Sequence, residues 1–559
     1  MKKSRFPTPN PSPRGDRRTI YVSDPSSIAI RYLPDPATED SLRNWVDDLA
    51  DAGTDTFIQE AYTQGWTTYW RTDKYEYDAR PQHKRFVPLL DSGVQPLQIL
   101  LDQSHRRGME FLAGIRVNDN HGHISVEQGV GAGSGFLTDN PQFHVTEIAG
   151  ETSLGSFLDF TFPEVRGHVA SVIKHLLDTF DVDGIELCFR DQAYFPNGTE
   201  RERYAEMTEF VRSVHDLISQ VSRSRSRRLI LGARVYATLG LCQDQGLDIE
   251  DWVKSGIIDY LAPSDIMYLS VNEPIDEFGE ITVDTDCMLY PAIMPHSSAR
   301  RIRFFDNQPL NLNQKRAAAQ NFYAAGADGL SLIYHFMAID WAPFYPMALH
   351  EMNELSEPDR VKQSRRDYVF EPMLGGQGIF EVAGMTTKGR PDPQRIVLKR
   401  EVGSAGKFRF RICEDLTDVR YASLLFRAYN MTDQDKITVS LNGHLIEYPN
   451  LKFRGATVPA HLPATSVKAS SQSSNLVDHE KRIDQKAGAD KSSHSSAGLS
   501  PVPTVPDSFT TGWFHLTEPP TNFGDNYLEV SLISTDPNAK EDIVIEEIEV
   551  DVIPLVKDA

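Results

Sequence analysis

Residues 182–191 read Val182-Asp183-Gly184-Ile185-Glu186-Leu187-Cys188-Phe189-Arg190-Asp191, and this stretch decides the fold. Apolar residues alternate here with Glu186, Cys188 and Arg190, which is the period of a β-strand. Glu186 and Arg190 therefore share one side of the strand. Because a buried carboxylate is costly without partners, the strand indicates either a structural ion pair inside the protein or the floor of a catalytic site.

Helical patterns lie on both sides of this strand. Upstream, Val165, Val169, Val172 and Leu176 follow Pro163 at the spacing of one helix face. Downstream, residues 199–220 carry a second stripe of the same period. Helix, buried strand, helix is the order of a parallel α/β fold.

The same alternation runs through the first 350 residues. We expect eight strands, over Ser27–Leu33, Thr56–Ala61, Glu110–Val117, Asp183–Arg190, Leu229–Val235, Ile257–Ala262, Met288–Met294 and Gly329–Tyr334. Eight strand–helix units predict a (β/α)8 TIM barrel. The alternative is a doubly wound open sheet, which usually carries a Gly-rich phosphate turn after its first strand. This chain has no such turn there.

The C-terminal part lacks the helical periodicity of the first 350 residues. Short strands are predicted over Arg395–Lys399, Lys407–Ile412, Ala422–Ala428, Lys436–Leu441, Tyr527–Ile533 and Ile543–Ile553, with Asn442-Gly443 as a hairpin turn. This pattern is typical of a β-sandwich. Residues 464–506 are rich in Ser, Lys, Asp and Ala, and they predict a disordered insert.

We therefore predict three parts, which are an N-terminal extension over residues 1–26, a barrel over 27–355 and a sandwich accessory domain over 367–559. A chain of 559 residues is too long for one core. We expect the sandwich to brace the barrel rather than to bind carbohydrate, because no clustered exposed aromatic residues stand out in it.

Composition narrows the class of partner. The formal net charge of −22 argues against nucleic acid as the main partner. No apolar run is long enough for a membrane span. The four cysteines show neither metal-ligand spacing nor a disulfide framework, so we expect no metal and no other cofactor. The first residues lack the apolar core of a secretory signal, which predicts a cytoplasmic protein. The oligomeric state is left open.

Two motifs carry a family resemblance. Asp183-Gly184-Ile185-Glu186-Leu187, preceded by Phe160-Thr161-Phe162-Pro163-Glu164-Val165-Arg166, resembles the family-10-like glycosyl hydrolases, which are barrel proteins loosely related to xylanases. Gly326-Ala327-Asp328-Gly329-Leu330-Ser331-Leu332 is similar to that family's last strand. The resemblance covers roughly residues 27–350 and implies hydrolysis of a glycosidic bond in an oligo- or polysaccharide. Family members commonly have Asp where this chain has Cys188. The resemblance therefore implies that Glu186 and Asp191 are the stronger candidates for the catalytic carboxyl group of this strand.

That chemistry needs one protonated and one ionised carboxyl group, and in a barrel such groups lie at the C-terminal ends of the strands. The chain offers carboxyl groups there at Glu60, Asp119, Glu186, Asp191 and Asp265. The seventh strand has none, so a xylanase-type nucleophile is not expected. We predict Glu186 or Asp191 as the ionised group and Asp265 as the acid. The alternative for Asp265 is a helix cap.

Other side chains are predicted to line a sugar site. Aromatic faces stack on sugar rings, and charged or amide groups bind hydroxyl groups. The predicted substrate-binding residues are Glu60, Trp66, Trp70, Arg116, Asn118, Asp119, Arg190, His335 and Trp341. The alternatives are that Trp66, Tyr69 and Trp70 pack within their loop, that Arg190 orients a neighbouring Glu, and that His335 is structural.

Two hypotheses of function follow from these residues. The first is a glycoside hydrolase, and the second is a catalytically inactive barrel that binds carbohydrate. A barrel hydrolase or lyase acting on another bond is a third. The sequence leaves the sugar, the linkage and the stereochemical outcome open.

Overall fold

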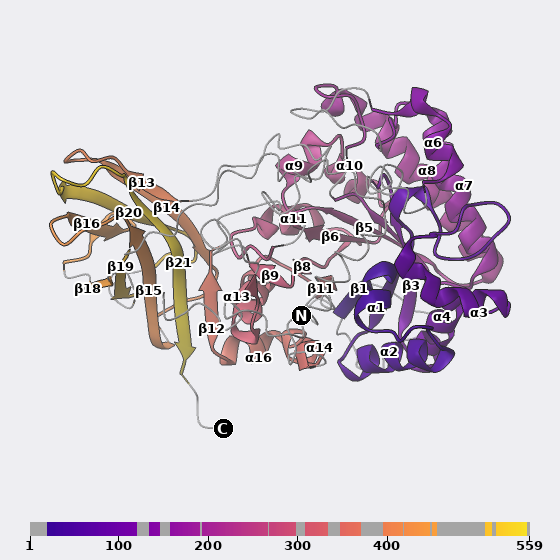
Figure 1. Ribbon diagram of the computed structural model, residues 1–559, viewed down its shortest axis with the longest axis horizontal. Coiled ribbons are helices and arrows are strands. Elements are labelled where there is room, and N and C mark those ends of the chain that lie inside the picture. Colours follow the sequence, from indigo (N-terminus) through magenta and orange to yellow (C-terminus); the bar gives the residue numbers. More distant parts are fainter. Residues whose placement is uncertain are drawn as a thin grey trace, which may run out of the picture.

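The structure is a computed structural model of the 559-residue chain. It describes residues 19–119, 133–145, 157–190, 193–265, 268–297, 308–333, 347–370, 395–417, 419–447, 450–454, 509–516 and 521–555. The N-terminal part is a parallel sheet surrounded by helices, and the C-terminal part is antiparallel (Figure 1). The predicted insert over 464–506 lies outside the described residues.

The parallel strands form a closed barrel. They are β1 (Thr19–Ser23), β2 (Thr56–Tyr62), β3 (Glu110–Arg116), β4 (Gly184–Cys188), β5 (Ile230–Tyr236), β6 (Tyr260–Ser264), β7 (Met288–Leu289), β8 (Ala292–Ile293) and β11 (Leu330–Ile333). Their order is β7-β6-β5-β4-β3-β2-β1-β11-β8. Because β7 and β8 are the two halves of one segment, the pairing of β7 with β6 and of β8 with β11 closes the ring. The predicted (β/α)8 barrel is confirmed.

Helices cover the outside of the barrel (Figure 1). The longer ones are α2 (Glu39–Asp51), α4 (Pro96–Arg106), α7 (Pro163–Thr179), α8 (Tyr204–Arg225), α11 (Ile275–Thr282) and α13 (Leu312–Ala324). The stripe predicted on α7 is buried at Val165, Val169, Val172 and Leu176. Burial of such a stripe against the sheet is what fixes each helix in place. No described helix is long and apolar enough to cross a bilayer.

Shorter elements fill the connections. They are α1 (Pro25–Arg31), α3 (Val87–Asp91), α6 (Gly135–Thr138), α9 (Leu239–Asp244), α10 (Ile249–Lys254), α14 (Met347–His350), α15 (Met352–Leu355), α16 (Pro358–Gln363), the 3-10 turns Gln64–Trp66, Pro81–Phe86, Pro141–Phe143 and Glu200–Arg203, and a small pair of strands, β9 (His296–Ser297) and β10 (Gln308–Pro309).

The first strand was predicted in the wrong place. The segment Ser27–Leu33, expected to be a strand, lies largely in helix α1. Asp24 caps this helix by accepting a hydrogen bond from the Ser26 N–H (3.0 Å), and Pro25 occupies its first turn. The first strand is β1, so the predicted N-terminal extension over 1–26 contains a barrel strand. The other proposed domain boundaries stay predictions.

The barrel interior alternates large and small residues. Glu60, Gly114, Glu186, Gly232 and Tyr260 follow one another across five neighbouring strands in register. Residues in register point to the same side of a parallel sheet. A Cβ atom added at Gly232 would lie 1.9 Å from the Tyr260 ring, so glycine is required for that ring to enter the barrel.

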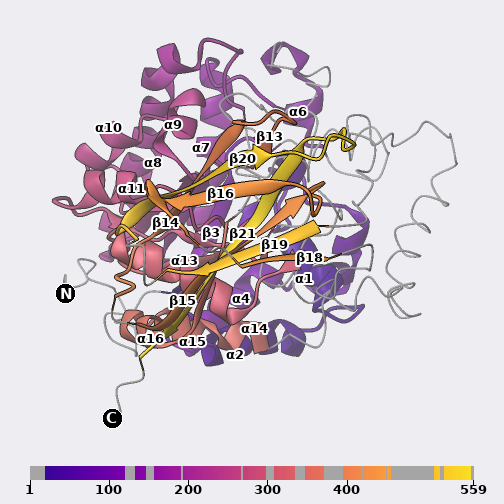
Figure 2. The same cartoon turned by 90° about the vertical axis from the view of Figure 1, so that its left-hand side faces the viewer.

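The C-terminal domain consists of two antiparallel sheets (Figures 1 and 2). The larger contains β12 (Arg366–Val369), β13 (Ile396–Leu398), β15 (Val419–Tyr429), β18 (Asn450–Arg454), β19 (Phe509–His515) and β21 (Ile543–Pro554). The smaller contains β14 (Ala405–Ile412), β16 (Lys436–Leu441), β17 (His444–Leu445) and β20 (Gly524–Ser534). Buried residues alternate along β14 and β20, as in a sandwich. The predicted sandwich is confirmed, and Asn442 and Gly443 make its hairpin turn with positive φ values.

The sandwich docks on the barrel through the free edge of β14. Asn272 accepts a hydrogen bond from the Arg411 N–H (2.8 Å), and Asn321 accepts one from the Cys413 N–H (2.8 Å). Asn321 also donates to the Arg411 carbonyl (3.0 Å). These two carboxamides take the place of a further strand, and an edge strand with satisfied backbone groups does not pair with other chains.

We predict that Gly232→Ala destabilises the protein by about 1–3 kcal/mol, because the added Cβ displaces the Tyr260 ring. Gly167, on helix α7, has no atom within 4 Å of an added Cβ and serves as the matched control. Gly167→Ala should leave stability unchanged or raise it by about 0.5–1 kcal/mol. Urea unfolding of both variants checks this, and an equal effect of the two would contradict the packing argument.

Candidate functional site

The C-terminal ends of the barrel strands carry a group of buried charged residues. Asp24 follows β1, Glu60 lies near the end of β2, Arg116 ends β3, Arg190 follows β4 and Asp265 follows β6. All five are buried. Polar side chains at this end of a (β/α)8 barrel are the usual location of an active site.

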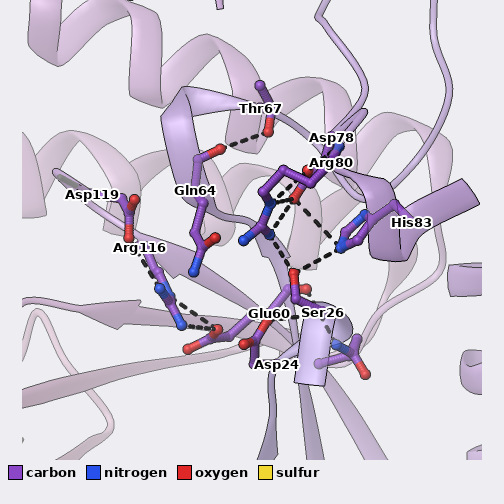
Figure 3. Close-up of polar contacts among 11 residues, drawn as sticks. Asp24, Ser26, Glu60, Gln64, Thr67, Asp78, Arg80, His83, Arg116 and Asp119 are labelled. Carbon is purple, nitrogen blue, oxygen red and sulfur yellow. Dashed lines mark hydrogen bonds and ion pairs between the residues drawn. The ribbon is translucent and has the colours of Figure 1, made fainter. Parts of the chain in front are cut away.

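Glu60, Arg116 and Asp119 form the first cluster of this face (Figure 3). Glu60 Oε2 lies 2.9 Å from Arg116 Nε and 2.8 Å from Arg116 Nη2, and Arg116 Nη1 lies 3.0 Å from Asp119 Oδ2. Burial raises the pKa of Glu60 above its ordinary value, and the charge of Asp24 adds to this, although Arg116 opposes it. Glu60, Arg116 and Asp119, predicted to bind substrate, are therefore brought together.

A second cluster lies opposite, on the loop after β2 and the start of α1. Arg80 Nε contacts both carboxylate oxygens of Asp78 (2.9 and 3.1 Å), and Arg80 also donates to Ser26. Burial alone would raise the pKa of Asp78, but His83 and Arg80 lower it. Figure 3 shows Gln64 between the two clusters, with its side chain directed toward the space that separates them. The sequence did not single out this second cluster.

Ser26, His83 and Asp78 do not form a catalytic triad. Ser26 Oγ (2.8 Å) and Asp78 Oδ2 (3.5 Å) both approach the same nitrogen, Nε2 of His83. A triad needs the carboxylate on Nδ1, and no described residue offers a partner to that atom. Burial lowers the pKa of His83 to about 4, so the ring is neutral at pH 7. The arrangement therefore gives no support to serine-based hydrolysis.

Glu186, predicted as a catalytic residue, lies inside the barrel in a buried ion pair with Arg234. Arg234 Nε and Nη2 donate to its two oxygens (2.9 and 3.1 Å), and the Tyr260 hydroxyl donates to Oε2 (2.8 Å). Arg234 also donates to Ser331 on β11 (2.6 Å), which shows that these side chains meet inside the barrel. The arrangement agrees with the structural alternative for Glu186, whose catalytic role stays a prediction, and its partner is Arg234, which the sequence analysis missed.

Cys188 occupies a position between two arginines. It is the register partner of Arg116 on β3 and of Arg234 on β5. Burial raises the pKa of its thiol to about 11, although Arg190 opposes this. The side chain is therefore a neutral thiol at pH 7.

The aromatic residues of the loop after β2 are packed rather than exposed. Trp66 contacts the rings of Tyr62, Phe136 and His168, and Trp70 contacts those of His175 and Phe180. Trp66, Tyr69 and Trp70 are at most 1% exposed. Stacking on a sugar needs a free ring face, so these contacts agree with the alternative that the rings pack within their loop, and substrate binding by Trp66 and Trp70 stays a prediction.

Asn118 is bound to the backbone of two loops. Its amide donates to the carbonyls of Leu158 (2.7 Å) and Ala193 (2.6 Å) and accepts from the Leu158 N–H (2.9 Å). These bonds tie two loops to the end of β3. The side chain of Asn118 therefore holds the loops in place, and its contact with a sugar hydroxyl stays a prediction.

Three predicted residues, Asp191, His335 and Trp341, lie outside the described residues. Asp265 is buried at the end of β6, and Arg190 lies near enough to Glu60 to lower the pKa of that carboxyl. Glu273, in the loop after β6, is a buried carboxyl that the sequence did not indicate. Within the described part of the chain, no group of three or more His, Cys, Asp and Glu is arranged to hold a metal ion.

We predict that His83 makes stability fall in mild acid. The unfolded chain binds a proton at His83 near pH 6.5, whereas the folded protein does so only near pH 4. Stability is therefore fully present above pH 6.5 and is lost by up to about 3 kcal/mol as the pH falls toward 4. Urea unfolding at pH 7 and pH 4.5 measures this loss. It should be smaller in His83→Gln, and an unchanged loss would contradict the assignment.

Comparisons with known proteins give a family match and several structural likenesses. A glycoside hydrolase domain of PgaB (BpsB) from Bordetella bronchiseptica is 15% identical, with 61% of this chain and 98% of that chain covered and a TM-score of 0.39. An alpha-amylase from Geobacillus thermoleovorans is 13% identical, with 76% and 92% covered and a TM-score of 0.38. No curated protein matches the sequence. Residues 17–225 match the Glycosyl hydrolase-like 10 family, which confirms the resemblance that the sequence motifs predicted.

Proposed function

We propose that this protein is a glycoside hydrolase that cleaves a glycosidic bond in an oligo- or polysaccharide. The observation that carries the proposal is the set of buried carboxyl groups at one end of the barrel, namely Asp24, Glu60, Asp119 and Asp265. Burying several carboxyl groups together is costly, and active sites are where proteins accept that cost. The match of residues 17–225 to a glycosyl hydrolase-like family supports the same chemistry.

Asp191 and Asp265 are the proposed reacting carboxyl groups. Glycoside hydrolysis needs a proton for the leaving oxygen and an ionised carboxylate that attacks the sugar or activates water. Glu186 is withdrawn from this role because Arg234 and Tyr260 engage both of its oxygens. Asp265 directly follows β6, at the end of the barrel strands, and Asp191 is proposed from its place in the sequence.

The clusters around Arg116 and Arg80 are proposed to bind the sugar. Both guanidinium groups are buried and held by carboxylates, Arg116 by Glu60 and Asp119, and Arg80 by Asp78. Fixed donors and acceptors of this kind orient hydroxyl groups without losing side-chain freedom on binding. Arg190, His335 and Trp341 remain proposed members of the same site.

A second function is a barrel that binds carbohydrate without cleaving it. Cys188 favours this alternative, because a neutral thiol replaces the acid that relatives commonly have at that position. With Glu186 held in an ion pair, strand β4 itself supplies no free carboxylate. Hydrolysis then depends on Asp191 and Asp265.

Carboxamide substitution distinguishes the two functions. Asp265→Asn and Asp191→Asn should each lower turnover by about 10²–10⁴-fold while sugar binding persists, because each removes one partner of the acid–base pair. Asp178→Asn, on the exposed face of α7, is the matched control and should keep full activity. Release of reducing ends from a panel of oligosaccharides is the measurement. Full activity in both site variants would refute the assignment, and binding without turnover by the wild type would favour the second function.

Cys188→Asp tests the departure from the family. The new carboxylate would lie between Arg116 and Arg234, which favour its ionised form. If the protein is a binder that lost its acid, Cys188→Asp should create turnover. If the protein is already an enzyme that uses Asp191 and Asp265, turnover should change by less than about tenfold, which corresponds to about 1.4 kcal/mol.

A further inference from the structure

Gln64 begins a turn whose backbone is strained and held on both sides. The 3-10 turn Gln64–Trp66 follows β2, and Gly65 and Trp66 have positive φ values of 68° and 63°. A bulky residue rarely adopts this left-handed conformation, so other contacts have to hold it. The Ser134 N–H donates to the Gly65 carbonyl (2.8 Å), and the Thr67 hydroxyl donates to the Gln64 carbonyl (2.7 Å).

The ring of Trp66 anchors this turn. It is 1% exposed, and it stacks on Phe136 at a centroid distance of 6.0 Å, with the Tyr62 ring edge-on at 6.1 Å. Because the ring is enclosed, the backbone of the turn cannot rotate without unpacking it. The preceding side chain, Gln64, is thereby directed toward the space between the first and second clusters of the site (Figure 3).

The carboxamide of Gln64 is available to a ligand. Gln64 is half-buried, and its carboxamide has no hydrogen-bond partner among the residues that the structure describes. A primary amide offers two donor hydrogens and one acceptor oxygen. A sugar hydroxyl group both donates and accepts hydrogen bonds, so it is a matching partner for an amide held in this space.

The arginines on either side of this amide are already engaged. Arg116 lies 2.8 Å from Glu60 Oε2 and 3.0 Å from Asp119 Oδ2, and Arg80 Nε contacts both carboxylate oxygens of Asp78. An acidic sugar would have to compete with these carboxylates for the guanidinium groups. An uncharged sugar instead donates hydroxyl hydrogens to the carboxylates and accepts from the amide. The space therefore fits the hydroxyl groups of a neutral sugar.

We propose that Gln64 determines the specificity of this site by binding a hydroxyl group of an uncharged sugar between the two clusters. The inference rests on the carbohydrate-directed function proposed above, and it adds a contact that the sequence did not indicate. Gln64 touches the sugar, whereas Thr67 is a positioning residue that acts through the Gln64 carbonyl.

Gln64→Met tests the contact, because methionine keeps the length of the side chain and removes its donor and acceptor. The probes are cellohexaose, maltohexaose, mannohexaose and chitohexaose, with hexagalacturonate as the acidic counterpart. For the neutral probe that the wild type binds best, Gln64→Met should raise the Kd by about 3–10-fold, the effect of one ordinary hydrogen bond. Where the wild type cleaves that probe, KM should rise equally and kcat should change by less than about twofold. Calorimetry and initial rates measure these quantities.

Gln220→Met is the matched control. Gln220 is an exposed glutamine on α8, so its replacement should leave the Kd unchanged. Four results would each overturn the inference. They are an unchanged Kd in Gln64→Met, a loss confined to kcat, tighter binding of hexagalacturonate than of every neutral probe, and no binding of any neutral probe.

A double-mutant cycle tests the positioning by Thr67. Thr67→Val removes the hydroxyl that holds the Gln64 carbonyl, and it should weaken binding of the same probe by less than Gln64→Met does. The double variant should bind no more weakly than Gln64→Met alone, because the carbonyl contact matters only through the amide that it places. Additive losses would overturn the positioning role.

The Tm distinguishes a sugar contact from a structural residue. Because the Gln64 carboxamide has no partner in the described part of the chain, Gln64→Met should keep the Tm within about 2 °C of the wild type. Gly65→Ala should lower the Tm, since it forces a side chain into the left-handed conformation. A fall in Gln64→Met as large as that in Gly65→Ala would mark Gln64 as structural and overturn the inference.

The outcomes for the contact and for the proposed function are distinct. If the wild type binds a neutral probe without cleaving it, the glycoside hydrolase function fails, while the Gln64 contact still stands on the change in Kd. If the wild type cleaves the probe and Gln64→Met binds it equally well, the proposed function stands and the contact alone fails.

Discussion

The ion pair between Glu186 and Arg234 is the constraint on which the barrel interior depends. Two charges so deeply buried are tolerated only when they are well paired, and Tyr260 and Ser331 add further hydrogen bonds to the pair. The glycine at position 232 leaves the space that the Tyr260 ring needs to reach the pair. The pair engages both oxygens of Glu186, so the proposed chemistry falls to carboxyl groups nearer the ends of the strands.

Periodicity predicted most of the fold because buried strands and one-sided helices leave a clear pattern in the sequence. The first strand was missed because Ser-Ile-Ala-Ile fits a helix and a strand equally, and Asp24 and Pro25 decide for the helix. Strands β12, β18 and β19 were missed as well. The closing of the barrel at β7 and β8 depends on pairing between distant segments, which a single-sequence pattern does not contain.

The candidate site was predictable only in part, and for a physical reason. Residues that end a strand, such as Glu60, Arg116 and Asp265, are indicated by the strand itself. The partner of Glu186 is Arg234, which lies 48 residues away in the sequence, on β5. The sequence analysis considered Arg190 instead, because Arg190 and Glu186 share one side of the same strand. Glu273 left no signal because its loop has no periodic pattern, and its burial depends on tertiary packing that a single sequence does not contain. The burial of Trp66 and Trp70 could not be predicted from the sequence either, because tertiary packing decides which aromatic rings are covered.

The carboxamides of Asn272 and Asn321 on the edge of β14 have a consequence for the evolution of the molecule. A sandwich separated from its barrel would present an unpaired strand edge, which is a template for aggregation. A barrel separated from its sandwich would lose the support of the loop that carries Glu273. The two domains are therefore inherited most safely as one unit. A sandwich joined to a different barrel would need asparagines at the same two positions of that barrel to cover the edge of β14.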